Sequence, residues 1–256
     1  MALTIDLTGR VVLVTGGSRG IGRGITEAFV SAGATVVTCA RSEAEPFSGT
    51  THVQCDVRDP ESVQAMVDRI VAKHGRLDVL INNAGGAPSA SAAEASPRFH
   101  DKIIALNLNA PLLVAQIANR AMQEQGSGGS IVNISSIAAN RPAPTIAAYA
   151  AAKAGVSNFT QWLAVHMAQE YSPNIRVNAI APGFFLTEQN RFLMTDAATG
   201  DLTPRGRKIL DHTPMGRFGA PRDLLGTVLW LMSPASAFVT GIVVPVDGGF
   251  SAYSGV

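Results

Sequence analysis

Tyr149 and Lys153 are the two residues of this chain whose types and spacing best fit acid–base chemistry. They occupy positions i and i+4, so on a helix their side chains lie on one face. A tyrosine phenol has a pKa of about 10 and is a poor base at neutral pH when it acts alone. A lysine ammonium one helical turn away favours the phenolate and would draw the pKa of Tyr149 towards the working range. Taken alone, a Tyr-x-x-x-Lys pair is more often an ordinary helix surface, so other motifs have to support the chemistry.

Ser136 could supply a hydrogen bond to the same reaction. It follows Ser135 at the end of the predicted strand Ser130–Ile134, shortly before Tyr149 in the chain. Its hydroxyl could hold a carbonyl oxygen while Tyr149 exchanges a proton with that oxygen. Neighbouring side chains of a strand point to opposite sides, so we expect Ser135 and Ser136 to face different ways.

The stretch from Val11 to Val30 predicts where an anion would bind. The apolar run Val11–Val14 is typical of a strand buried on both faces, and Thr15–Gly22 (TGGSRGIG) leads from it into a segment with a helical apolar period. A strand that enters a helix through glycines presents free backbone N–H groups and leaves room for a pyrophosphate. The spacing is G-x-x-x-G-x-G, which is neither G-x-G-x-x-G nor a P-loop ending in Gly-Lys-Ser/Thr.

Together these motifs resemble those of the short-chain dehydrogenase/reductase (SDR) family. The glycine turn matches its T-G-x-x-x-G-x-G pattern, and Asn-Asn-Ala-Gly (82–85), the serine pair, Tyr-x-x-x-Lys and a strand-end Pro-Gly follow in the expected order over nearly the whole chain. The resemblance implies an NAD(P)(H)-dependent oxidoreductase that interconverts a secondary alcohol and a ketone by hydride transfer, with Tyr149 as acid and base. It also implies that Ser136, the later serine, is catalytic, and that Asn107 holds a water linking Lys153 to solvent.

The same resemblance implies which residues bind the cofactor. Asp56 would bond to the adenine amino group, and Pro-Gly-x-x-x-Thr (182–187) would hold the nicotinamide carboxamide and phosphate. Phe184-Phe185 departs from the family, which often has a smaller aliphatic residue there. The cofactor-binding residues expected on this basis are Gly16, Ser18, Arg19, Gly20, Ile21, Gly22, Arg41, Asp56, Val57, Asn83, Ala84, Gly85, Tyr149, Lys153, Pro182, Gly183 and Thr187.

The end of the second predicted strand favours NADP(H) over NAD(H). In dinucleotide-binding folds an acid at this point accepts from the ribose 2′-OH, whereas a basic residue suits a 2′-phosphate. This strand, Ala34–Thr38, runs into Cys39-Ala40-Arg41 and carries no acid. Arg19, inside the glycine turn, would be a second cation on the same side. The alternative for Arg41 is a solvated loop residue without a ligand.

Strand-like and helix-like segments alternate along the chain. Further strands are predicted at 52–55, 78–82, 130–134, 174–180 and 242–246, the last at an edge because it contains a proline. The alternation predicts an α/β, single-domain Rossmann fold: a doubly wound parallel sheet of about seven strands with helices on both faces. We expect one domain over residues 1–256, with a mobile loop at 86–97 and a substrate lid at 184–221 that includes a short helix near 206–210.

Composition argues against several other classes of protein. The net charge is +1 without a dense basic run, which disfavours a nucleic-acid binder. The five histidines have no metal-ligand spacing, no apolar segment reaches transmembrane length, and the first ten residues do not resemble a signal peptide. Cys39 and Cys55 are expected to be reduced, buried thiols of a cytoplasmic protein, with no disulfide or metal.

The charged content of 15% beside 46% hydrophobic residues hints at surface buried between subunits. The family resemblance implies a homotetramer in which the two long helices, at about 98–125 and 149–171, pair between subunits. It also implies that the C-terminal segment 249–256 is buried.

The substrate is predicted from the lid and from the segment after Ser136. Residues 184–191, 212–219 and 248–255 are similar to a branch of the family that includes mannonate- and fructuronate-type sugar-acid oxidoreductases. Arginine is a natural partner for a carboxylate. We therefore expect a small polar or anionic hydroxy/keto substrate, held by Arg141, Phe185, Gln189 and Arg191. Three alternatives stay open: an apolar pocket under a solvated lid, a 3-oxoacyl-thioester (acyl carrier protein) reductase, and a dinucleotide-binding regulator without turnover.

Overall fold

A computed structural model describes residues 5–255 except for residues 48, 87, 92 and 142. Val256 of the predicted buried tail, Ala87 and Ala92 of the predicted mobile loop, and the first four residues therefore lie outside the described residues.

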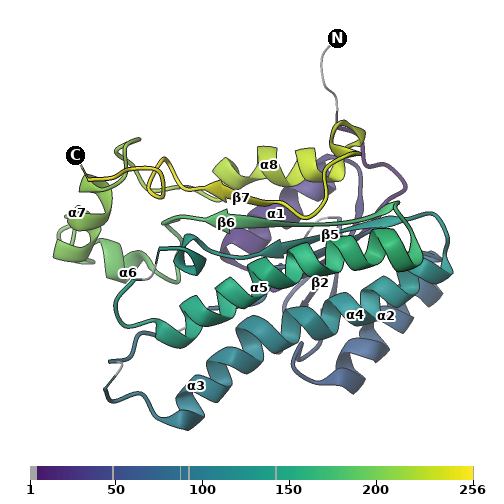
Figure 1. Cartoon of the computed structure of the whole chain (residues 1–256), viewed down its shortest axis with the longest axis horizontal. Coiled ribbons are helices and arrows are strands. Elements are labelled where there is room, and N and C mark those ends of the chain that lie inside the picture. Colours follow the sequence, from purple (N-terminus) through teal and green to yellow (C-terminus); the bar gives the residue numbers. More distant parts are fainter. Residues whose placement is uncertain (1–4, 48, 87, 92, 142, 256) are drawn as a thin grey trace.

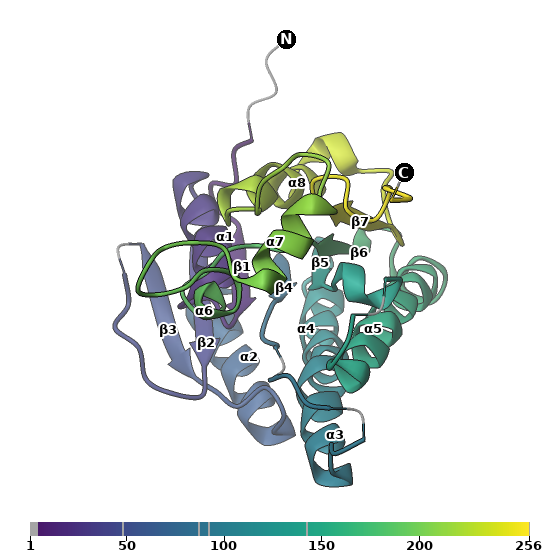
Figure 2. The same ribbon diagram turned by 90° about the vertical axis from the view of Figure 1, so that its left-hand side faces the viewer.

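The described residues form one parallel sheet of seven strands with helices packed beside it (Figure 1). The strand order is β3-β2-β1-β4-β5-β6-β7, which can be followed in Figure 2. The order reverses between β1 and β4, and a parallel sheet with such a reversal opens a crevice at the carboxyl ends of its strands. The prediction of a doubly wound parallel sheet, with the last strand of the chain at one edge, is thus confirmed. The strands are β1 (Val11–Thr15), β2 (Thr35–Ala40), β3 (Thr50–Gln54), β4 (Val79–Asn82), β5 (Gly129–Ile134), β6 (Ile175–Pro182) and β7 (Val243–Val246).

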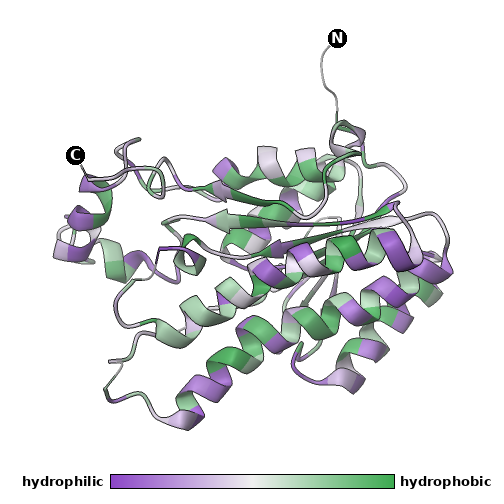
Figure 3. Cartoon of the chain, viewed as in Figure 1, coloured by the Kyte–Doolittle hydropathy of each residue, from purple (hydrophilic) through white to green (hydrophobic). Residues whose placement is uncertain are grey.

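Helices cover both faces of the sheet, and each face has its own apolar core (Figure 2). On one side pack α1 (Gly20–Ser31) and α8 (Arg222–Met232), with residues such as Phe29 and Leu224 fully buried. On the other side pack α2 (Pro60–His74), α4 (Ala110–Glu124) and α5 (Ala147–His166). These helices carry both apolar and polar residues along their length, which is the mixed colouring expected of amphipathic helices (Figure 3).

Local sequence signals explain where the elements begin and end. Asp59 caps α2 by accepting from the backbone N–H groups of Glu61 and Ser62, and Pro60 takes the first helical position. Gly75 ends the same helix in the left-handed conformation, with φ of 74°.

The two long helices predicted from the sequence each contain one wider turn, which interrupts the first and ends the second. The first consists of α3 (Pro97–Ile104), a π-turn (Ala105–Asn109) and α4, and the second is α5 followed by a π-turn (Met167–Tyr171). The lid contains the predicted short helix as α7 (Pro204–Asp211), and it also contains α6 (Arg191–Met194), which was not predicted.

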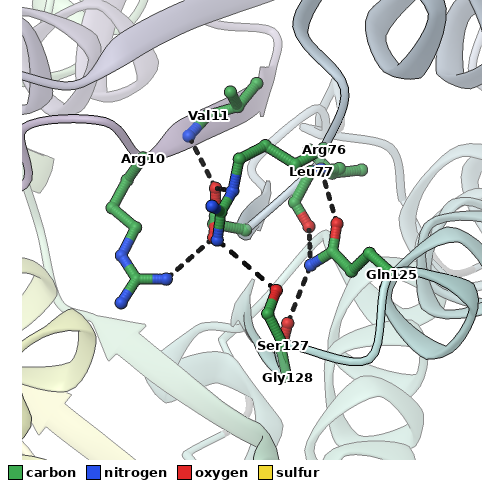
Figure 4. A network of polar contacts seen from close by, with 8 residues as sticks. Arg10, Val11, Arg76, Leu77, Gln125, Ser127 and Gly128 are labelled. Carbon is green, nitrogen blue, oxygen red and sulfur yellow. Dashed lines mark hydrogen bonds and ion pairs between the residues drawn. The ribbon is translucent and has the colours of Figure 1, made fainter.

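A buried carboxylate joins the amino-terminal ends of the central strands, which lie opposite the carboxyl ends that form the crevice. Figure 4 shows the surrounding network, with Arg10, Val11 and Arg76 labelled. Asp78, whose side chain is 3% exposed, accepts from Arg10 Nη1 (2.8 Å), Arg76 Nε (2.8 Å) and the backbone N–H of Val11 (2.9 Å). Burial alone would raise the pKa of Asp78, but these hydrogen bonds outweigh it and hold the pKa below its usual value. Asp78 was predicted to begin the fourth strand, and β4 begins one residue later, at Val79, although the backbone of Asp78 still bonds to Val11 and Ser130 of the neighbouring strands.

Candidate active site

A cavity of about 1040 Å³ opens over the carboxyl ends of the strands, where the strand order reverses. Its wall is built by the glycine turn, the ends of β2, β4, β5 and β6, the first turn of α5 and part of the lid. The structure brings most of the residues predicted from the sequence onto this wall, namely Gly16, Ser18, Arg19, Gly20, Ile21, Gly22, Arg41, Val57, Asn83, Ala84, Gly85, Ser136, Tyr149, Lys153, Pro182, Gly183, Phe185, Thr187 and Gln189.

The glycine turn presents an uncapped helix N-terminus to this cavity. Helix α1 begins at Gly20, and its N-cap Arg19 makes no side-chain hydrogen bond to the first turn. The backbone N–H groups of Gly20, Ile21 and Gly22 have no partner within the first turn of a helix, so they are free to bind an anion. The turn therefore fits the pyrophosphate of a dinucleotide.

The glycines of the turn are needed for different reasons. Gly16 and Gly20 have φ of 64° and 55°, which favour glycine. A Cβ at Gly22 would collide with the carbonyl oxygen of Gly16 and the side-chain amide of Asn83. Gly22 is thus required by close packing inside the protein, whereas the sequence alone had pointed to room for the ligand.

The Asn-Asn-Ala-Gly segment links neighbouring strand ends by hydrogen bonds. Asn82 Nδ2 donates to Asn133 Oδ1 of β5 and to the carbonyl of Pro111 (both 3.0 Å). Asn83 Nδ2 donates to the carbonyls of Thr15 (2.9 Å) and Gly16 (3.1 Å). These bonds fix the glycine turn against the end of β4.

Tyr149, Ser136 and Lys153 meet on one wall of the cavity. Tyr149 is hydrogen-bonded to Ser136, and Ser136 Oγ also accepts from the backbone N–H of Ala138 (3.1 Å). Lys153 is 4% exposed, donates from Nζ to the carbonyl of Ile134 (2.6 Å) and lies 5.6 Å from the centre of the Tyr149 ring. The three groups are therefore within reach of a single small carbonyl compound.

Burial controls the acid–base properties of this pair. It raises the pKa of Tyr149 above its usual value, and the hydrogen bond to Ser136 opposes the rise without cancelling it. It also lowers the pKa of Lys153 to about 8. The lowering of the pKa of Tyr149 expected from the neighbouring Lys153 is therefore not seen, because burial of the phenol sets the direction of the shift.

Ser135 has a different role from Ser136, and sequence reasoning gave it none. Its Oγ donates to the carbonyl of Lys153 (3.1 Å) and lies 2.7 Å from Ser157 Oγ. It therefore fastens the end of β5 to α5. The alternation of side chains along the strand predicted that the two serines would differ, but not which contacts each would make.

Asn107 is fully buried in the π-turn between α3 and α4. Its Oδ1 accepts from the N–H of Gly86 (2.8 Å), and its Nδ2 donates to the carbonyls of Gly86 (2.9 Å) and Ile103 (2.9 Å). Asn107 therefore lies behind the cavity wall and holds Gly86, which is on the wall. A Cβ at Gly85 would lie 2.9 Å from Asn107 Oδ1 and 3.5 Å from Lys153 Nζ, which places Asn107 and Lys153 on the same side of this loop.

At the adenine end of the cavity the wall carries Arg41 and Ser42 but no acid among the described residues. Asp56 is absent from the wall, although its neighbours Cys55 and Val57 are present. Its carboxylate is paired with Arg58 (2.6 Å), and this hydrogen bond lowers the pKa of Asp56.

At the lid end of the cavity the structure separates the four predicted substrate residues. Phe185 and Gln189 lie on the wall, whereas Arg141 and Arg191 do not. Arg141 instead donates through Nη2 (2.8 Å) and Nε (3.3 Å) to the carbonyl of Ser251, because the C-terminal turn lies beside the loop that follows Ser136. Arg191 is exposed at the start of α6.

The wall also includes residues that were not predicted. Gly86, Pro88 and Ser89 come from the predicted mobile loop, and Asn190, Phe192 and Leu193 come from the unpredicted α6 segment. Phe184, next to Phe185, packs away from the cavity against Phe250 (ring centres 5.1 Å apart). Asn190, Phe192 and Leu193 follow Gln189 closely in the predicted lid, and this was the only feature of the sequence that pointed to them.

The described residues contain no group of three or more His, Cys, Asp or Glu side chains that could hold a metal ion. Within that same part of the chain, none of the helices has the length and apolarity needed to cross a bilayer.

The chain matches a family model described as Enoyl-(Acyl carrier protein) reductase over residues 16–251. It is 39% identical to the uncharacterised oxidoreductase UxuB of Bacillus subtilis, with 98% of both proteins covered. It is 35% identical to the 2-dehydro-3-deoxy-D-gluconate 5-dehydrogenase of Escherichia coli, with 96% of this chain and 97% of the relative covered. A solved structure of a candidate D-mannonate oxidoreductase from Haemophilus influenzae, with bound NAD, is similar with a TM-score of 0.86, 33% identity and 98% of both chains covered.

The match to UxuB covers nearly the whole chain, and the family model covers the glycine turn from Gly16 onwards together with the Tyr149 wall of the cavity. The chain therefore belongs to the short-chain dehydrogenase/reductase family and is an NAD(P)-dependent oxidoreductase that acts on CH–OH groups.

Proposed function

We propose that the enzyme interconverts the secondary alcohol and ketone forms of a small sugar acid, with NADP(H) as its preferred cofactor. The chemistry is supported above all by one observation: Tyr149, Ser136 and Lys153 share a cavity wall with the glycine turn. The substrate class is supported by the relatives, a 2-dehydro-3-deoxy-D-gluconate 5-dehydrogenase and a candidate D-mannonate oxidoreductase.

The bound cofactor supplies or accepts the hydride at its nicotinamide ring. In the reducing direction Ser136 donates a hydrogen bond to the carbonyl oxygen, and Tyr149 transfers its phenolic proton to that oxygen as the new C–H bond forms. In the oxidising direction the phenolate of Tyr149 takes the hydroxyl proton. Because burial favours the protonated phenol, the phenolate needs the positive charge of Lys153 and of the oxidised nicotinamide.

Other residues support this step by holding the catalytic groups in place. Ser135 and Ser157 hold α5 against β5 and so keep Tyr149 and Lys153 in place. Asn107 orders Gly86 on the wall and is the residue we assign to the water link from Lys153 to solvent. Asp56 remains the residue we assign to the adenine amino group. Its carboxylate would then accept hydrogen bonds from both Arg58 and the ligand.

The preference for NADP(H) is supported by Arg41 and Arg19 on the cavity wall and by the lack of an acid among the described residues of the wall beside them. A guanidinium is suited to the 2′-phosphate that distinguishes NADP from NAD. We treat residues 1–256 as one cofactor-binding domain and residues 184–221 as its substrate lid. The two free cysteines are consistent with a cytoplasmic enzyme.

Turnover of a sugar acid is the experiment that tests the substrate class. With NADPH, the keto form of a six-carbon sugar acid is expected to have a kcat/KM at least about tenfold above that of a 3-oxoacyl thioester or an aliphatic ketone. Initial rates read from NADPH absorbance would measure this. Preferential turnover of the thioester would instead favour the 3-oxoacyl-thioester reductase alternative. Cofactor binding without turnover of any compound would favour the regulator.

We further propose a homotetramer, supported by an exposed row of aromatic side chains along α5. Phe159 stacks on Trp162, Trp162 stacks on His166 (ring centres 4.8 Å apart), and His166 lies edge-on to Tyr171. Trp162 and Tyr171 are 57% and 55% exposed, although aromatic rings of this size are normally covered. A second copy of the chain would cover this row.

Trp162→Glu is therefore expected to reduce the mass of the assembly, because it would place a charge in the centre of an apolar contact. Light scattering after gel filtration would measure the change against the 26.7 kDa subunit. Arg69→Glu on the exposed side of α2 is the control and should leave the mass unchanged. An unchanged mass for both variants would exclude the α5 face as the interface.

A further inference from the structure

Edge strand β3 holds the loop that follows β2 through three side chains on one of its faces. Thr50, His52 and Gln54 alternate along β3, so they point to the same side. Thr50 Oγ1 donates to the carbonyl of Phe47 (2.7 Å), His52 Nε2 lies 3.2 Å from the carbonyl of Ser42, and Gln54 Nε2 donates to the carbonyl of Arg41 (2.9 Å). We call these three side chains the β3 ladder and residues 41–47 the phosphate loop.

Two further contacts support the phosphate loop, one indirectly through His52 and one directly at Phe47. A carbonyl oxygen only accepts, so His52 Nε2 carries the hydrogen towards Ser42, and Nδ1 accepts from Thr38 Oγ1 of β2 (3.0 Å). Arg23 of α1 lies over the ring of Phe47, with its guanidinium carbon 4.8 Å from the ring centre. The loop is therefore bonded to β3, and through Phe47 it also contacts α1.

The phosphate loop carries the residues that would discriminate between the two cofactors. Arg41 and Ser42, whose carbonyls the ladder binds, are the loop residues on the cavity wall. The positive charge of Arg41 also interacts electrostatically with Asp56 and helps to lower the pKa of that carboxyl. A loop with ordered main-chain carbonyls presents Arg41 and Ser42 in one place before any ligand arrives, which reduces the entropy lost on binding.

We infer that the β3 ladder is a positioning device for cofactor selectivity: Thr50, His52 and Gln54 preorder Arg41 and Ser42 for a ribose 2′-phosphate. This inference rests on the proposed preference for NADP(H). Among the described residues, the side-chain hydrogen bonds of the ladder reach only the phosphate loop and β2, so its loss should weaken binding of the cofactor that carries the 2′-phosphate and leave binding of NADH nearly unchanged.

The test compares the dissociation constants of NADPH and NADH for the full chain, measured by titration calorimetry. The double variant His52→Leu/Gln54→Leu is expected to raise the NADPH constant about tenfold and the NADH constant less than about twofold. Thr50→Val should act in the same direction, and Thr50→Ser, which keeps the hydroxyl, should restore binding. Gln64→Leu on α2 removes a glutamine that bonds only to Asp68 (2.8 Å) and is the matched control.

Arg41→Ala separates this inference from the proposal beneath it. If Arg41→Ala leaves the NADPH constant unchanged, the proposed phosphate site fails and the inference fails with it. If Arg41→Ala weakens NADPH but the ladder variants do not, the inference alone is overturned. An equal loss of affinity for NADPH and NADH in the ladder variants would also overturn it, because the ladder would then only stabilise the fold.

Thermal melts of each variant identify chains that have not folded. Thr50→Val, a change of nearly equal volume, keeps the test available if the double variant is one of them.

Discussion

Tyr149→Phe is expected to lower kcat by a factor of about 10²–10⁴, because it removes the only phenolic proton donor on the described cavity wall. The phenyl ring keeps its volume and its packing, so the glycine turn and Lys153 remain in place and cofactor binding should change little. Single-turnover and steady-state rates with a reactive carbonyl substrate, together with a cofactor titration, would measure both effects.

The control for this prediction is Tyr171→Phe, which removes a hydroxyl from a tyrosine that is 55% exposed at the end of the π-turn after α5. Its rates should match those of the unaltered enzyme. Full turnover by Tyr149→Phe would contradict the assignment of the proton donor, whereas loss of cofactor affinity would show that the hydroxyl helps to bind the dinucleotide.

The same assignment predicts opposite pH responses for the two reaction directions. Burial raises the pKa of Tyr149, so the phenol stays protonated at neutral pH and is ready to donate in reduction. Oxidation needs the phenolate, so its rate should rise with pH across the range in which reduction begins to fall. An oxidation rate that stays flat between about pH 6 and about pH 10, the range below and up to the usual pKa of a tyrosine, would count against Tyr149 as the base.

Asp78→Asn is expected to lower the free energy of unfolding by about 3 kcal/mol. The side chain of Asp78 is 3% exposed and accepts from Arg10, Arg76 and the backbone of Val11, and an uncharged amide satisfies these donors poorly (Figure 4). Urea unfolding followed by circular dichroism would measure the loss. Activity at low temperature should be retained, because Asp78 lies at the edge of the sheet opposite the cavity. Asp68→Asn on α2 is the control.

Asp78 also makes a prediction about acid stability. Its pKa in the folded protein is lowered, so its contribution to stability is present above the unfolded pKa of about 4 and is lost as the pH falls through the folded value. Stability of the unaltered protein should therefore decrease below about pH 4 more steeply than that of Asp78→Asn. Parallel curves for the two proteins would show that other carboxylates control acid unfolding.

Much of the fold could be predicted because the positions of its strands, helices and turns depend on residues that are close together in the sequence. The buried run Val11–Val14, the cap formed by Asp59 and Pro60, and the glycine turn each depend on neighbours within a few residues, and the structure has all three. The i, i+4 spacing of Tyr149 and Lys153 likewise fixes a common helix face before any tertiary contact forms. The lid was harder, since its short helices are stabilised by packing and not by a long apolar period.

Contacts between residues far apart in the chain could not be read in this way. Nothing near Arg141 indicates that it turns to the carbonyl of Ser251, and nothing near Gly22 indicates that Asn83 fills the space beside it. The widening of the helix around Asn107, which turns its amide towards Gly86, also depends on the loop packed against it.

The sequence by itself determined the reaction class, because the helix face of Tyr149 and Lys153 and the glycine turn are set by local spacing. Only the tertiary structure decided that Ser136 contacts the phenol while Ser135 bonds to α5, that Arg41 is held from β3, and that burial raises the pKa of Tyr149. The reason is that desolvation and cross-strand hydrogen bonds arise only when segments distant in sequence are packed together.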